Sequence, residues 1–203
     1  MKTQVYDGNT SAAPLTMTSP VRRHIESSSY VFQHAFGVPE EIKRLDELHE
    51  GISEYFDQHL ALVDLSDMQP QNILELGAGS GAWAIQAVLQ FPKATVLAAD
   101  KASLPERPFR PMWYSKSRSY RAAFAVYQSG YDIVHAWLVM MHLPSGPGIL
   151  RHVCKLVKPG GWLIVEEPDD DNMANAGPAN KEFVFIWLNL MRERGSSLHW
   201  QRP

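Results

Sequence analysis

The sequence has little cysteine and no long apolar stretch. Its one cysteine, Cys154, excludes a disulfide framework and a cysteine-based zinc site, and we expect it to be a small buried side chain on a helix. No segment reaches the ~18 consecutive apolar residues of a membrane span. Residues 1–20 contain no hydrophobic block like that of a secretory signal. These absences predict a cytoplasmic protein, with the nucleus as the alternative, and no membrane partner.

An excess of either charge is also missing. Lysine and arginine total 19 and aspartate and glutamate 22, which gives a net charge of −3. This balance argues against nucleic acid as the main partner. His, Asp and Glu are scattered without metal-ligand spacing, so no metal site is predicted. A hydrophobic content of 45% over 203 residues excludes a wholly disordered chain and suits one domain of ordinary size.

The chain divides into three regions. Residues 1–20 have few large apolar side chains to offset the entropy of ordering, and we expect a disordered tail. Residues 21–70 form a predicted N-terminal helical cap, in which a helix begins at Pro39 and apolar residues recur every three or four positions. Asp46 and His49 on this helix are interpreted as structural. Residues 71–203 form the third region.

Strand and helix patterns alternate through residues 71–203. We predict strands at 72–77, 94–99, 131–136 and 162–166, and helices at 82–91, 148–157 and 181–194. Strands that alternate with helices indicate βαβ units, and continuous apolar strands indicate a sheet covered on both faces. The expected fold is therefore α/β, with a Rossmann-like, doubly wound and mostly parallel sheet.

The strongest functional signal is a glycine-rich loop, Glu75-Leu-Gly-Ala-Gly-Ser-Gly81, between a predicted strand and a predicted helix. Glycines allow a sharp turn and a close approach to a ligand. The free N–H groups of the following helix can hold a phosphate or a carboxylate. Gly77, Gly79 and Ala82 also satisfy the relaxed dinucleotide fingerprint, so a nicotinamide-dependent oxidoreductase remains an alternative.

Three further features accompany the loop. Glu75 stands two residues before the first glycine, where an acid can receive an amino group, and Asp100 ends the next strand, where it can bind ribose hydroxyls. The third feature is the turn Lys158-Pro-Gly-Gly161, which leads directly into a late strand. Together these features resemble class I S-adenosylmethionine-dependent methyltransferases, and the Lys158 turn disfavours the oxidoreductase.

Shorter motifs suggest a subfamily. The pattern Glu40-x-x-x-Arg44-Leu-Asp-x-x-His49 is similar to fungal secondary-metabolism methyltransferases, and the block from Tyr131 to Pro144 is similar to bacterial small-molecule methyltransferases. The resemblance implies methyl transfer from S-adenosylmethionine to a small molecule, a secondary metabolite, with S-adenosylhomocysteine as product. It extends from about Tyr30 to the last residue.

The same resemblance assigns cofactor residues. The glycine loop would lie along the amino-acid end of the cofactor, Glu75 would bind that end through water or the backbone, and Asp100 would accept both ribose hydroxyls. Residues at the end of the predicted strand 131–136 would line the sulfonium side, where aromatic rings can face the cation. The full set is Tyr30, Glu75, Gly77, Ala78, Gly79, Gly81, Asp100, His135, Ala136 and Trp137.

Catalysis needs little more than positioning, because the sulfonium already activates the methyl group. A hydroxyl nucleophile also needs a base. His142 is the predicted base, because neutral imidazole suits this task near neutral pH. Glu167, at the end of a strand, is predicted to orient His142 or to bind an amine.

Two departures from the family pattern bear on function. The segment between the predicted strands 94–99 and 131–136 has no acid between Glu106 and Asp132 to hold adenine, and the sheet would lack the last two of the usual seven strands. A bare sheet edge predicts a homo- or hetero-oligomer that covers it. The alternative function is therefore a catalytically weak or inactive methyltransferase-fold subunit that acts in regulation or assembly with a partner.

Overall fold

The computed structural model describes residues 2–7, 38–102, 105, 112–116, 130–143, 146–167, 177–179, 181–182, 185–186 and 189. Their elements are the strands β1 (Lys2–Asp7), β2 (Asn72–Leu76), β3 (Thr95–Asp100), β4 (Met112–Lys116), β5 (Tyr131–Trp137) and β6 (Val157–Glu167), the helices α2 (Val38–Tyr55), α3 (Ala82–Gln90) and α5 (Gly146–Cys154), and the short 3₁₀ helix η1 (Met140–His142).

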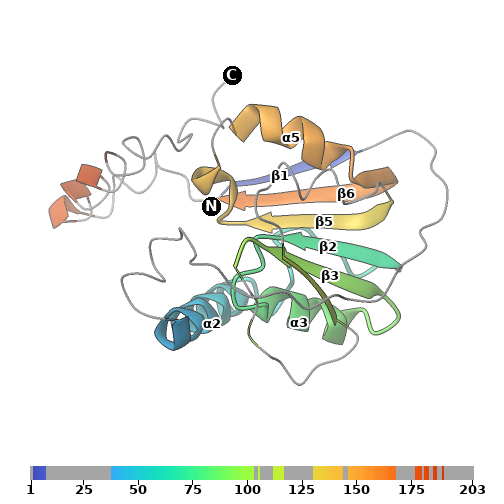
Figure 1. Cartoon of the computed structure of the whole chain (residues 1–203), viewed down its shortest axis with the longest axis horizontal. Coiled ribbons are helices and arrows are strands. Elements are labelled where there is room, and N and C mark those ends of the chain that lie inside the picture. Colours follow the sequence, from blue (N-terminus) through green and yellow to red (C-terminus); the bar gives the residue numbers. More distant parts are fainter. Residues whose placement is uncertain are drawn as a thin grey trace.

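The strands form one sheet in the order β1-β6-β5-β2-β3-β4 (Figure 1). The pairs β6–β5, β5–β2, β2–β3 and β3–β4 are parallel, whereas β1 is antiparallel to β6. After the edge strand β1, the chain enters the parallel part of the sheet at the central β2, moves outward to β4, and then returns to the other side of β2 for β5 and β6. The strand order therefore reverses between β2 and β5, and open α/β sheets bind ligands at such a point. The predicted α/β, mostly parallel fold is confirmed.

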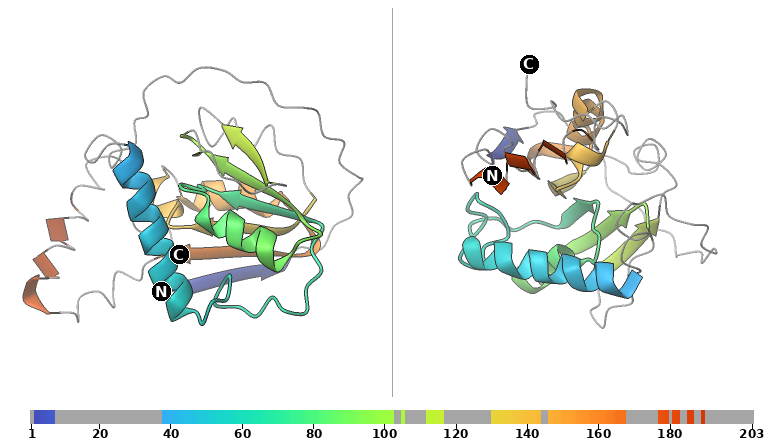
Figure 2. Two further views of the ribbon diagram at one scale, coloured as in Figure 1. Left: turned by 90° about the horizontal axis from the view of Figure 1, so that it is seen from below. Right: turned by 90° about the vertical axis from the view of Figure 1, so that its left-hand side faces the viewer.

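Helices cover both faces of the sheet because its strands alternate between two apolar layers. Ile73, Val96 and Ile133 pack with Ala84 and Ala87 of α3 on one face. Leu74, Val134 and Leu163 pack with Ile149 and Val153 of α5 on the other. Helix α2 lies on the same side of the sheet as α3 (Figures 1 and 2).

The Lys158 turn belongs to an irregular start of β6. Tyr131 pairs with Val157, but Ile133 already pairs with Trp162, so residues 158–161 bulge out of the ladder. A side chain at Gly161 would meet the Asp132 carbonyl oxygen at 2.8 Å. The predicted glycine turn is present, and the strand assignment extends through it.

The predicted disordered tail is wrong for residues 2–7, because β1 pairs with β6 from Lys2↔Glu167 to Asp7↔Trp162. An edge strand is held by backbone hydrogen bonds and does not need a long apolar sequence. Thr3, Val5 and Tyr6 also have high β-propensity. Since β1 covers the outer side of β6, the expectation that an oligomer must cover that edge loses its basis.

Cys154 lies on α5 as expected, but its side chain is exposed rather than buried. Among the helices that the structure describes, none has the length and apolar character to cross a membrane.

Candidate functional site

The glycine loop follows β2 at the carboxyl end of the sheet and is tied to the neighbouring strand. The backbone N–H groups of Gly77 and Ala78 both donate to the carbonyl oxygen of Ala99, at 2.7 and 3.0 Å. Gly77, Gly79 and Gly81 have φ values of 70°, 55° and 79°, a region that side chains disfavour. Gly81 is the N-cap of α3. The sequence needs glycine here because the chain turns directly from strand into helix.

Close packing adds a second reason for glycine. A side chain at Gly77 would collide with Val139 in the loop after β5. A side chain at Gly79 would lie 3.1 Å from the Leu45 side chain of α2. The glycine loop therefore packs between the β5 loop and α2.

Asp100 is bound to the same loop. One carboxylate oxygen, Oδ2, accepts the N–H of Gly79 at 2.8 Å, and the other, Oδ1, accepts the N–H of Ala102 at 2.7 Å. Burial raises the pKa of this carboxyl group, and the backbone donors partly offset that rise. The backbone N–H of Lys101 is a third donor to this carboxylate. A carboxylate has about four acceptor sites, so Asp100 can still accept a hydroxyl proton while it keeps its contacts to the loop.

Glu75 lies beneath the start of α3. Burial and the charge of Asp100 raise its pKa well above the ordinary value, while the N–H of Ala84 acts in the opposite direction. Its Oε2 atom is buried and has no hydrogen-bond partner in the part of the chain that the structure describes. An ammonium group would supply both the missing donor and a compensating charge. These features fit the amino-acid end of S-adenosylmethionine.

The three predicted residues of β5 separate according to strand alternation. His135 is fully buried and stacks on Trp83 of α3, with ring centroids 3.8 Å apart, and its Nε2 lies 3.4 Å from Glu166 Oε2. Ala136 points to the opposite face and joins the core beside α5. Only Trp137 reaches the end of the strand, where its ring meets His49 edge to face at 6.1 Å. His135 and Ala136 therefore support the site from below.

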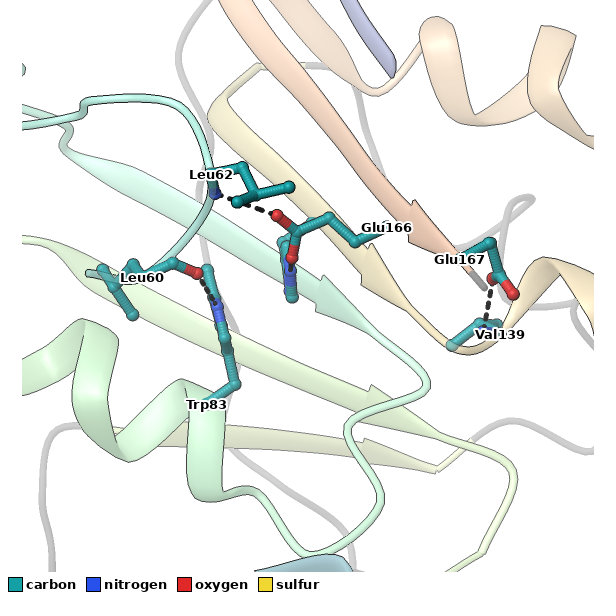
Figure 3. A network of polar contacts seen from close by, with 7 residues as sticks. Leu60, Leu62, Trp83, Val139, Glu166 and Glu167 are labelled. Atoms are coloured by element: carbon teal, nitrogen blue, oxygen red, sulfur yellow. Dashed lines mark hydrogen bonds and ion pairs between the residues drawn. The ribbon is translucent and has the colours of Figure 1, made fainter. Parts of the chain in front are cut away.

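Glu166 and Glu167 are both buried at the end of β6 (Figure 3). Glu166 Oε1 accepts the N–H of Leu62, and Glu167 Oε1 accepts the N–H groups of Val139 and Met140 at 2.7 and 2.6 Å. Glu167 thus fixes the loop that leads into η1, and His142 is the last residue of η1.

His142 lies beside α2. Burial, and then the nearby Arg44 charge, lower the pKa of its imidazole and favour the neutral form. Arg44 itself donates to both carboxylate oxygens of the buried Glu41, at 2.7 and 2.8 Å. Tyr30, the remaining predicted residue, falls outside the described residues.

Sequence reasoning missed the role of α2. Leu45 packs on Gly79, and His49 lies one turn later against Trp137. Both residues stand on one face of the helix at i, i+4 spacing, which is the signal that could have found them. His49, interpreted as structural, thus lies beside the predicted site residue Trp137.

Metal chemistry finds no support in the part of the chain that the structure covers. Groups of three or more His, Cys, Asp or Glu able to hold a metal ion are absent from the described residues.

The chain is similar to known methyltransferases over most of its length. Residues 47–203 match the methyltransferase domain family. Methyltransferase str3 of the fungus Strobilurus tenacellus is 46% identical over 129 residues, which cover 64% of this chain and 46% of str3. The secondary metabolism regulator laeA of Aspergillus fumigatus is 26% identical over 161 residues, 73% of this chain and 42% of laeA. The chain spans about half the length of these curated relatives.

Solved structures agree on the fold. Human N-acetylserotonin methyltransferase, solved with S-adenosylmethionine, superimposes with a TM-score of 0.54 at 19% identity, over 82% of this chain and 48% of that one. The likeness concerns the fold. The chain is therefore a member of the class I S-adenosylmethionine-dependent methyltransferase family.

Proposed function

We propose that this chain binds S-adenosylmethionine at the carboxyl end of its sheet and transfers the methyl group to a small molecule, a secondary metabolite. One observation carries the proposal: the Gly79 N–H donates to Asp100 Oδ2, which joins the glycine loop to the carboxylate best placed to bind a ribose. The similarity to str3 supports the reaction class.

The cofactor-binding residues follow from this arrangement. Asp100 accepts the ribose hydroxyls, Glu75 receives the amino group, and Trp137 faces the sulfonium. The loop residues Gly77, Ala78, Gly79 and Gly81 let the cofactor approach the backbone closely. His135 and Ala136 hold the end of β5 in place, and Tyr30 completes the proposed set.

Bound S-adenosylmethionine supplies a methyl group that is already activated for displacement. The residues of this chain position the acceptor and, for a hydroxyl acceptor, remove a proton. His142 is one candidate base, since its lowered pKa keeps it neutral at neutral pH. Glu167 fixes the loop before it through the Val139 and Met140 N–H groups.

The proposal includes a cellular compartment and a class of partner. A single cysteine fits a reducing compartment, so we assign the protein to the cytoplasm, with the nucleus as the alternative. The balanced charge supports a small-molecule partner rather than nucleic acid.

A second candidate is a regulatory subunit with little or no catalysis. The similarity to the secondary metabolism regulator laeA favours it. Both candidates share the cofactor site, so binding of the cofactor does not separate them.

Methyl transfer to an added acceptor distinguishes the two functions. The 203-residue chain is incubated with methyl-labelled S-adenosylmethionine and a panel of phenols, alcohols and carboxylic acids. Label in an extracted small molecule, lost in Asp100→Asn, is the expected result. S-adenosylhomocysteine binding without label transfer to any acceptor would favour the regulatory subunit.

A further inference from the structure

We propose that Glu167 is a positioning residue for the cofactor site: it fixes the turn between β5 and η1, and this turn holds the glycine loop in its ligand-binding shape. Glu167 acts through the backbone of the turn, residues 138–140, rather than by contact with the cofactor. The inference rests on the proposed methyltransferase function and deepens it, because it names a buried side chain on which cofactor affinity depends.

The end of β6 binds three consecutive backbone N–H groups of the turn. The Leu138 N–H donates to the carbonyl oxygen of Glu166 at 3.0 Å. The N–H groups of Val139 and Met140 both donate to Glu167 Oε1, at 2.7 and 2.6 Å (Figure 3). Consecutive N–H groups that converge in this way form a concave anion site, and here a carboxylate of the protein itself fills it. The end of β6 therefore determines the path of the chain as it leaves β5.

The turn adopts a conformation that its sequence disfavours. Leu138 has a φ of 54°, in the left-handed region where the Cβ atom of a leucine crowds the neighbouring carbonyl group. Val139 returns to the right-handed region, with a φ of −113° and a ψ of −43°. A leucine stays at positive φ only where surrounding contacts compensate for the cost, and the hydrogen bonds to β6 do so here. Without the Glu167 acceptor, we expect the turn to relax.

The side chain of Val139 connects the turn to the glycine loop. Val139 is buried, and its methyl groups occupy the space that a side chain at Gly77 would need. Gly77 is the first glycine of the loop and donates its N–H to the Ala99 carbonyl oxygen on β3. A relaxed turn would move Val139 away from Gly77, and the loop would loosen at the point where it leaves β2.

The burial of Glu167 favours this role over the predicted alternative, binding of an amine. Its side chain is only 1% exposed. Its Oε1 atom already accepts two N–H groups from a single turn. An amine acceptor would need an accessible carboxylate oxygen, whereas a positioning residue needs only the backbone contacts that Glu167 makes.

Hydrogen exchange of the whole chain tests the positioning role without cofactor or activity. Glu167→Met has a side chain of similar length but no acceptor for the two N–H groups. Peptides that cover residues 138–143 should therefore exchange about tenfold faster than in the wild type. Peptides that cover residues 77–81 should also exchange faster, because the turn no longer holds Val139 against the loop.

The matched control is Asp132→Asn, at the opposite end of the sheet. Asp132 Oδ2 also accepts two backbone N–H groups, those of Gln71 and Asn72, both at 2.9 Å. This variant should lower the free energy of unfolding without faster local exchange at residues 77–81, and it should bind S-adenosylhomocysteine as the wild type does. The contrast separates a positioning role of Glu167 from general support of the fold.

Calorimetric titration with S-adenosylhomocysteine measures the consequence for the cofactor. Affinity should fall about tenfold in Glu167→Met. It should fall less in Glu167→Gln, because the amide oxygen of glutamine can still accept the two N–H groups. If Glu167→Met does not fold, Glu167→Gln replaces it in every measurement, with effects of the same direction and several-fold in size.

A second substitution gives a readout that a purely structural role would not produce. Glycine adopts a positive φ without the cost that leucine has, so Leu138→Gly should favour the native turn even without the Glu167 acceptor. Addition of Leu138→Gly to the Glu167 variant should therefore recover part of the lost affinity for S-adenosylhomocysteine. If Glu167 only supported the core, the second substitution would weaken the protein further.

Four outcomes would overturn the inference: a folded Glu167 variant with wild-type exchange at residues 77–81, one with wild-type affinity for S-adenosylhomocysteine, an equal loss of affinity in Asp132→Asn, or a double variant that binds more weakly than the Glu167 variant alone. A wild-type chain that shows the expected exchange pattern but does not bind S-adenosylhomocysteine would keep the link between Glu167 and the glycine loop and contradict the proposed methyltransferase function.

Discussion

Two aspartates at opposite ends of the sheet perform the same local task with different consequences. Asp132, near the amino end of β5, accepts the N–H groups of Gln71 and Asn72 at 2.9 Å through Oδ2. Asp100, at the carboxyl end of β3, accepts the N–H groups of Gly79 and Ala102. Each carboxylate joins its own strand to a neighbouring segment.

The difference lies in what else each carboxylate meets. Asp132 also forms an ion pair with Lys158, which uses its remaining capacity inside the protein. Asp100 instead accepts a third backbone N–H, from Lys101, and lies beside a loop of three glycines with positive φ. Asp132 is thus paired with a lysine at one end of the sheet, whereas Asp100 at the other end is held by backbone donors of the glycine loop and of the segment after β3. A strand-end acid is therefore informative only together with the loop that follows the adjacent strand.

The largest predicted effect is a difference in stability between alanine variants of two glycines, one at each end of the sheet. Gly77→Ala places a methyl group against Val139 at a positive φ, so we expect about 4 kcal/mol of lost stability and loss of S-adenosylhomocysteine binding. Gly160→Ala has a similar φ of 73° but nothing within 4 Å, so only about 1 kcal/mol of strain is expected. Denaturant unfolding of both variants measures the contrast, and equal losses would contradict it.

Removal of Asp132 should weaken the fold and leave the cofactor site intact. Asp132→Ala leaves two backbone N–H groups and Lys158 without their partner. We therefore expect the free energy of unfolding to fall by about 3 kcal/mol. S-adenosylhomocysteine affinity, measured where the variant is folded, should be unchanged. The control is Asp67→Ala in an exposed turn, with little effect on unfolding. A large loss of S-adenosylhomocysteine affinity in Asp132→Ala would show that the two ends are not separate.

A smaller effect, of opposite sign, is expected at Glu75. Its folded pKa is raised above 4.5, so ionisation at higher pH costs folding energy, whereas below pH 4.5 the group is protonated in both states. Glu75→Gln should therefore stabilise the protein by roughly 1–2 kcal/mol at neutral pH. The gain should vanish as the pH falls below 4.5. Thermal unfolding across pH, beside the exposed control Glu54→Gln, tests this sign.

The sequence predicted the parallel sheet, the glycine loop and Asp100 because each depends on local pattern. Apolar runs, glycines at a strand end and a following acid are visible without tertiary contacts. Strand β1 was missed because edge pairing is made by the backbone, and its sequence is short and half polar. The contact of His49 with Trp137 was missed because it joins residues 88 positions apart in the sequence.

His135 illustrates the limit of motif transfer. The resemblance to methyltransferases placed His135 on the sulfonium side of the cofactor. Strand alternation instead turns its side chain into the core, where it stacks on Trp83. A place at the end of a strand therefore predicts that a residue is near a site. The burial of its side chain decides whether a ligand can contact it.

The central claim is that the glycine loop and Asp100 form a cofactor site, and a calorimetric titration with S-adenosylhomocysteine tests it most directly. Asp100→Asn keeps the size of the side chain and removes its charge, and the loss of a charge-assisted acceptor should weaken binding about tenfold or more. The variant also loses stability, because both oxygens of Asp100 accept backbone N–H groups and the amide nitrogen of Asn cannot accept one, so binding is measured where Asp100→Asn is folded. Micromolar binding by the wild type that weakens in this way is the predicted result. A folded wild-type chain that does not bind, or an Asp100→Asn variant that binds as well as the wild type, would contradict the account.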